Sequence, residues 1–198
     1  MNLPNKITCV RLALAVIVLV LLCLPWSSLG WSDESRIIPI MGEQVDIVML
    51  IAGALFAIAS FTDFLDGYIA RKNNIVTDFG KVMDAIADKV LVNGVLIALA
   101  CDGLINVAVP VIIISRDIFV DSIKMVAGSK GKAVGASVLG KLKTICMMTG
   151  VTLVFFQNIP FELININVAE GLVYLATILS IISGVQYYII NAEAFKEK

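Results

Sequence analysis

"DFLDGYIARKNNIVTDFGKVMDAIAD", residues 63–88, holds five aspartates and three basic residues between two strongly apolar stretches of the chain. If a helix runs from Ile47 to about Arg71, positions 63, 66, 67 and 70 share one of its faces, since they stand 0, 3, 4 and 7 residues along it. Positions 80, 84 and 88 share a face of the following helix by the same rule. Helices joined by so short a turn are antiparallel neighbours, so the sequence predicts that two acidic faces meet.

The chain as a whole is too apolar for an ordinary soluble domain. Of its 198 residues 59% are hydrophobic, whereas soluble domains contain roughly 45–50%. Its charge-free runs predict one all-α integral membrane domain covering residues 1–198, with six transmembrane helices and a short N-terminal interfacial helix at Leu3–Val10. The expected spans are roughly 9–28, 47–71, 80–101, 104–126, 140–158 and 168–191. We interpret the first as a retained span rather than a secretory signal, because no small-residue cleavage site follows it.

The basic residues predict the orientation of these spans. In the six-span arrangement, Arg36 is the only one of fifteen Lys and Arg residues that lies in the loops opposite the two termini. Cytoplasmic loops carry an excess of Lys and Arg. We therefore expect a multi-pass protein of a bacterial cell membrane whose termini and acidic segment face the cytoplasm.

Four carboxylates close together in a membrane need a positive partner, since an intramembrane charge is costly and like charges repel. Carboxylate oxygens suit hard cations such as Mg²⁺ or Mn²⁺, and a shared cluster can hold two ions beside a phosphate substrate. Two other interpretations stay open at this point. The aspartates could form an ion or proton path in a small ion-coupled transporter, or they could be structural partners of Arg71, Lys81 and Lys89.

The spacing of the segment, D-x-x-D-G-x-x-A-R-x(8)-G-x-x-x-D-x-x-x-D, resembles the signature of the CDP-alcohol phosphotransferase family. The residues at the fixed positions are Asp63, Asp66, Gly67, Ala70, Arg71, Gly80, Asp84 and Asp88. The resemblance extends to "NLPNKITCVRL" at 2–12, "ISRDIFVDSIK" at 114–124 and "SVLGKLKT" at 137–144. In these details the chain looks most like the members that form phosphatidylglycerophosphate.

The resemblance implies transfer of a phosphatidyl group from CDP-diacylglycerol to glycerol 3-phosphate, with CMP leaving, by a metal-dependent homodimer. It implies that Asp63, Asp66 and Asp84 bind the metal and that Asp88 is the general base and a ligand of a second ion. An aspartate base also agrees with the absence of histidine from the chain. The positions implied for CDP-diacylglycerol binding are Asn5, Thr8, Asp66, Gly67, Ala70, Arg71, Thr77 and Gly80.

The acceptor alcohol is the open choice, because other family members of the cardiolipin synthase or phosphatidylinositol-phosphate synthase type use different acceptors. Arg116 lies about thirteen residues into the fourth span, where an arginine needs a partner. Its neighbour Asp117 points about 100° away on a helix and is an imperfect partner. We therefore expect Arg116, together with Lys141 and Lys143, to bind the phosphate of a phosphorylated acceptor.

Overall fold

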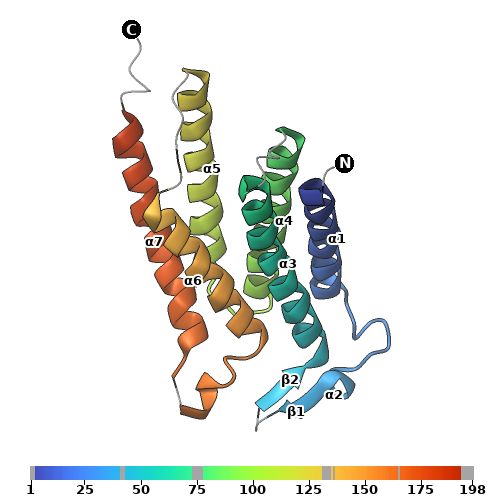
Figure 1. The fold of residues 1–198 in the computed structure, drawn as a ribbon. Coiled ribbons are helices and arrows are strands. Elements are labelled where there is room, and N and C mark those ends of the chain that lie inside the picture. Colours follow the sequence, from blue (N-terminus) through green and yellow to red (C-terminus); the bar gives the residue numbers. More distant parts are fainter. Residues whose placement is uncertain are drawn as a thin grey trace.

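The computed structural model is a bundle of long helices with a small hairpin at one end (Figure 1). It describes residues 3–40, 43–72, 78–130, 135, 137–164 and 166–192, without the side chains of residues 3, 4, 33, 43, 64–72, 78, 79, 81 and 163. The long helices are α1 (Leu3–Cys23), α3 (Ile47–Lys72), α4 (Asp78–Cys101), α5 (Ala108–Ser129), α6 (Val138–Phe155) and α7 (Val168–Asn191). The short elements are α2 (Asp33–Arg36), β1 (Ile37–Ile40), β2 (Glu43–Asp46) and the 3-10 helix η1 (Phe161–Ile164).

The long helices form two groups of three. Helix α1 packs extensively against both α3 and α4, and α7 packs against both α5 and α6. The groups join where α3 contacts α6 and where α4 contacts α5. In the described residues the direct contact between α3 and α4 is small, because α1 packs against both. The connection between the acidic helices is short, as expected, but much of their packing is against α1.

The first helix differs from the expected one. Residues 3–10 belong to one continuous helix that ends at Cys23, so a separate interfacial helix is not confirmed, and the predicted span 9–28 ends earlier. Pro25 follows closely and cannot continue the hydrogen-bonding pattern of a helix. The indole of Trp26 then donates a 2.8 Å hydrogen bond to the carbonyl of Leu21 in the last turn.

The composition of the helices makes the chain an integral membrane protein. Within the described residues three segments are long and apolar enough to cross a bilayer, namely Asn5–Cys23, Val138–Phe155 and Val168–Asn191. Large apolar side chains remain exposed on the outside of the bundle, Ile118, Ile145 and Ile178 among them, and lipid is a favourable environment for such side chains. The all-α membrane fold is confirmed to this extent, and six spans remain a prediction.

The hairpin was not predicted from the sequence. Strands β1 and β2 pair antiparallel, with Ile37 opposite Asp46 and Ile40 opposite Glu43. Asp46 then accepts a 2.7 Å hydrogen bond from the amide of Val48 and so caps the start of α3. The hairpin lies at the end of the bundle opposite the start of α1 and the end of α7 (Figure 1).

Candidate active site

A buried arginine of α1 stands between the two acidic helices. Arg11 is 1% exposed, and its guanidinium forms ion pairs with Asp63 on α3 and Asp84 on α4. The two carboxylates thus approach one point, toward the end of the bundle where α3 ends and α4 begins (Figure 1). In this structure the positive charge that the carboxylates require comes from α1.

Sequence reasoning missed Arg11 as a site residue, although the signal was present. Asn5, Thr8 and Arg11 recur at every third position and are 9%, 4% and 1% exposed. Three polar residues one helical turn apart, in a segment whose other polar residue is the exposed Lys6, indicate a buried polar face. Continuing the pair Asn5 and Thr8 by one more turn leads to Arg11.

The expected base, Asp88, lies one turn beyond Asp84 on α4. It lines a pocket of about 260 Å³ between α4, α5, α6 and α7. The charged residues of this pocket are Asp88, Lys89, Arg116, Asp117, Asp121, Lys124, Lys141 and Lys143. Five cations against three carboxylates give the lining a surplus of two positive charges, so the pocket favours an anionic ligand.

Arg116 does have protein partners, and Asp117, expected to be an imperfect one, is among them. Its Nη1 donates to Asp117 Oδ1 at 2.9 Å, its Nε to the carbonyl of Ser180 at 3.0 Å, and its Nη2 to Ser183 Oγ at 2.6 Å. The angle between neighbouring positions on a helix applies to the Cβ direction, whereas the long arginine side chain bends back toward its neighbour. Gly184 gives it room, because a Cβ there would lie 3.0 Å from Arg116 Cγ.

The two lysines expected beside Arg116 also line the pocket. Lys143 is 8% exposed and its Nζ donates to both carboxylate oxygens of Asp117, at 2.8 and 3.0 Å. Lys141 is exposed at the pocket wall. Asp117 therefore holds Arg116 and Lys143 next to each other.

Several expected site residues lie outside the described side chains. These are Asp66, Gly67, Ala70, Arg71 and Thr77. Gly80 is described and lies half-buried in the first turn of α4. Lys89, one of the alternative structural partners of the aspartates, pairs instead with Asp121 on α5.

The residues at the acidic end suit a divalent cation by their chemistry and placement. The carboxylates of Asp63 and Asp84 converge on the same guanidinium, so their oxygens can also face a common ion. In the described part of the chain no group of three or more possible ligands gathers at one point. The expected third ligand, Asp66, lies one turn from Asp63, outside the described side chains.

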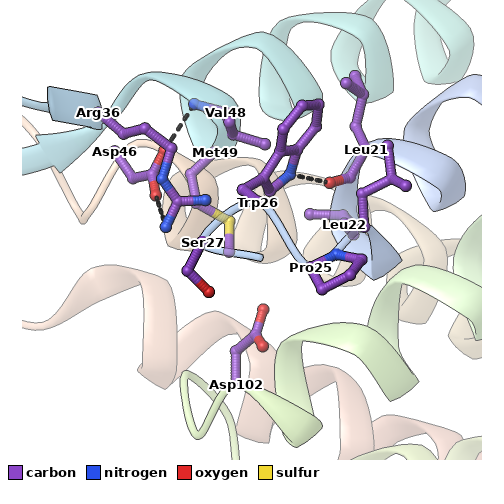
Figure 2. A pocket seen from close by; sticks show the side chains of 11 residues that line it. Leu21, Leu22, Pro25, Trp26, Ser27, Arg36, Asp46, Val48, Met49 and Asp102 are labelled. Atoms are coloured by element: carbon purple, nitrogen blue, oxygen red, sulfur yellow. Dashed lines mark hydrogen bonds and ion pairs between the residues drawn. The ribbon is translucent and has the colours of Figure 1, made fainter. Parts of the chain in front are cut away.

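A second pocket, of about 300 Å³, lies at the hairpin end of the bundle (Figure 2). Arg36 and Asp46 form an ion pair of 3.6 Å at its wall, and Asp102 points into it from the turn after α4. None of the expected site residues lines this pocket. The acidic cluster and the cation-rich pocket thus remain the candidate active site.

Comparison with known proteins identifies the family of the chain. The family profile described as CDP-alcohol phosphatidyltransferase matches residues 1–182. A protein of Bacillus subtilis (strain 168) named CDP-diacylglycerol--glycerol-3-phosphate 3-phosphatidyltransferase is 39% identical over 197 residues, which cover 98% of this chain and 97% of that protein. A protein of the same name from Mycoplasma pneumoniae is 34% identical over 92% of this chain and 84% of its own length. Another from Rickettsia bellii is 32% identical over 94% of this chain and 93% of its own length. The chain belongs to the CDP-alcohol phosphatidyltransferase family.

Proposed function

We propose that the protein transfers a phosphatidyl group from CDP-diacylglycerol to glycerol 3-phosphate, which yields phosphatidylglycerophosphate and CMP. The observation that carries this proposal is the pocket in which Asp88 lies together with Arg116, Lys141 and Lys143. A base and a set of phosphate-binding cations in one cavity suit an acceptor that has both a hydroxyl and a phosphate group. The printed names of the relatives support the same reaction.

In the proposed mechanism the cations hold the acceptor's phosphate while Asp88 accepts the proton of its attacking hydroxyl. The hydroxyl oxygen forms a bond to the phosphorus that carries the diacylglycerol, and the bond from that phosphorus to the CMP oxygen breaks. Arg116 presents a planar fork to the phosphate, and Lys143 adds a compact charge. A surplus of two positive charges matches a phosphate dianion.

The lipid nucleotide belongs at the acidic end of the bundle. We assign its binding to Asn5, Thr8, Asp66, Gly67, Ala70, Arg71, Thr77 and Gly80. We assign the metal to Asp63, Asp66, Asp84 and Asp88. Two Mg²⁺ or Mn²⁺ ions, when bound there, neutralise charge on the pyrophosphate and on the departing CMP.

The proposed setting is a homodimer in a bacterial cell membrane, with six spans per chain and with the termini and the active site on the cytoplasmic side. Described Lys and Arg residues support this sidedness. Arg36 lies by the hairpin, whereas Lys6 at the start of α1 and Lys130 just after α5 lie toward the other end. Both substrates then reach the site from the membrane surface or the cytoplasm.

One assay tests the proposal. Purified protein in detergent receives CDP-diacylglycerol and, in separate reactions, glycerol 3-phosphate, phosphatidylglycerol, inositol phosphate or serine, and CMP release is followed. We expect CMP release with glycerol 3-phosphate and with none of the other three acceptors. A chelator should abolish turnover, and added Mg²⁺ or Mn²⁺ should restore it. CMP release with phosphatidylglycerol or inositol phosphate instead identifies a cardiolipin synthase or phosphatidylinositol-phosphate synthase. Turnover that survives the chelator contradicts the metal assignment, and ion flux in liposomes without CMP release indicates a transporter.

A further inference from the structure

Tyr187 of α7 contacts both helices that carry the proposed acceptor-binding cations. It is 6% exposed, packs in one apolar cluster with Val120 and Ile123 of α5, and lines the same pocket as Asp88. The proposed mechanism gives it no role. A buried tyrosine beside a charged pocket therefore calls for a physical explanation.

The ring of Tyr187 lies near two cations of α5. The guanidinium carbon of Arg116 is 5.8 Å from the ring centroid, and Lys124 Nζ is 5.4 Å from it. Cations within about 6 Å of an aromatic centroid are attracted by the electron density of the ring. The ring thus helps to keep two like charges close together at one wall of the pocket.

The hydroxyl of Tyr187 binds the chain just before α6. It accepts a 2.9 Å hydrogen bond from the amide of Ser137 and donates a 2.9 Å hydrogen bond to the carbonyl of Gly135. Ser137 is the N-cap of α6, and its Oγ accepts a 3.0 Å hydrogen bond from the amide of Gly140. The phenol therefore fixes the point at which α6 begins.

Two lysines of the pocket, Lys141 and Lys143, lie in the first two turns of α6, directly after this point. A helix is stiff over such a short distance, so the position of Ser137 also sets the positions of Lys141 and Lys143. One side chain of α7 thus contacts Arg116 through its ring and the start of the lysine-bearing helix through its hydroxyl.

We propose that Tyr187 is a positioning residue of the acceptor pocket. It holds Lys141 and Lys143 at a fixed distance from Arg116 and so sets the affinity for the acceptor's phosphate. This inference rests on the proposed function for its substrate, but the contacts that carry it do not involve the metal site or the nucleotide site. If Tyr187 only filled space, phenylalanine could replace it without loss of affinity for the acceptor.

Tyr187→Phe is the decisive variant, since it keeps the ring and removes only the hydroxyl. We expect the KM for glycerol 3-phosphate to rise about threefold to tenfold, because the substitution removes the two hydrogen bonds of the hydroxyl and only part of their free energy is transmitted to the phosphate site. The KM for CDP-diacylglycerol should stay within about twofold. Tyr188→Phe is the matched control, because Tyr188 is the next residue of α7 and is 50% exposed, and it should change neither constant.

Hydrogen exchange gives a second measurement that needs no turnover. Peptides covering residues 137–144 should exchange faster in Tyr187→Phe than in the wild type, and added inorganic phosphate should protect them less. If the wild type does not use glycerol 3-phosphate, the proposed function is wrong, and the exchange comparison with phosphate still decides the role of Tyr187. Unchanged exchange overturns the inference. Faster exchange with an unchanged KM for glycerol 3-phosphate also overturns it, and so does an equal change in the KM values of the two substrates.

Discussion

Asp117 shows how a single carboxylate organises the proposed acceptor pocket. It accepts hydrogen bonds from Arg116 and Lys143, whose charges would otherwise repel each other. An acceptor phosphate thus meets cations that are already in place, so binding orders few further side chains.

Asp88→Asn tests the general base. The amide cannot accept the proton of the acceptor hydroxyl, so we expect kcat to fall by about 10²- to 10⁴-fold, the usual contribution of general base catalysis. Binding of CDP-diacylglycerol, measured by equilibrium titration, should persist. Asp121→Asn is a suitable control, because Asp121 lines the same pocket but pairs with Lys89. Near-normal turnover of Asp88→Asn removes this residue from the mechanism.

Arg116→Lys tests phosphate recognition. The substitution keeps the charge but removes the planar fork that contacts Asp117, Ser180 and Ser183. A charge-assisted hydrogen bond is worth about 1.5–3 kcal/mol, so we expect the KM for glycerol 3-phosphate to rise about 10- to 100-fold. Steady-state kinetics should find the KM for CDP-diacylglycerol almost unchanged. Arg36→Lys, at the other end of the bundle, serves as the control, and equal effects on both substrates would make Arg116 structural.

At the scale of the helices, spacing in the sequence predicted much of the fold. Helices α3 and α4 cover the segments expected for the second and third spans, because long apolar runs and helical periodicity are strong signals. The hairpin at residues 37–46 was missed, since two four-residue strands that include a proline carry little pattern.

The packing order of the helices could not be predicted from the sequence either. A short connection indicates that α3 and α4 lie near each other, but it does not exclude a third helix that packs against both. The position of α1 brings Arg11 to Asp63 and Asp84, so it explains why this residue was missed. The partners of Arg116 were missed for a related reason, because Ser180 and Ser183 lie on a helix distant in the sequence.

Gly53 tests the packing that joins the two groups of helices. A Cβ at this position of α3 would lie 2.5 Å from Cβ of Phe155 on α6, an atom that cannot move without its backbone. We expect Gly53→Ala to lower the free energy of unfolding by about 1–3 kcal/mol through overpacking. Thermal unfolding in detergent measures the effect. Gly171→Ala is the control, because nothing lies within 4 Å of a Cβ there, and a Tm loss in both variants would point to a cause other than packing.

Asp102, in the turn after α4, should make stability depend on pH. Partial burial raises the pKa of Asp102 above its ordinary value of 3.8, and the Asp46 carboxylate raises it further. The folded protein therefore keeps this proton to a higher pH than the unfolded chain, and ionisation destabilises the fold as the pH rises past the raised pKa. We expect Asp102→Asn to have a higher Tm than the wild type at about pH 7, with a difference that shrinks toward about pH 4. A constant difference across this range would contradict the assignment.

At the scale of the whole molecule, the two ends of the bundle carry different chemistry. The hairpin and the turn after α4 lie at one end, and the acidic cluster lies toward the other (Figure 1). If the proposed orientation is right, the first end faces the outside of the cell. Only the second end then meets glycerol 3-phosphate and CMP in the cytoplasm.

Cysteine labelling in intact cells tests this orientation. The four native cysteines, which are all free in the structure, are first replaced by alanine. We expect Leu104→Cys, at an exposed position in the turn between α4 and α5, to react with a membrane-impermeant maleimide added outside. Ser129→Cys, at the end of α5, should react only after the cells are opened. The reverse pattern would invert the topology and place the active site outside.

The burial of Arg11 has a consequence for how the protein is made. Helix α1 leaves the ribosome before α3 and α4, and it carries an arginine whose two carboxylate partners, Asp63 and Asp84, follow more than fifty residues later. Until α3 and α4 enter the bilayer, that charge has to reach toward the lipid head groups or water. The first span therefore cannot take its final position alone. We therefore expect α1 to dock late, after α3 and α4 have supplied both carboxylates.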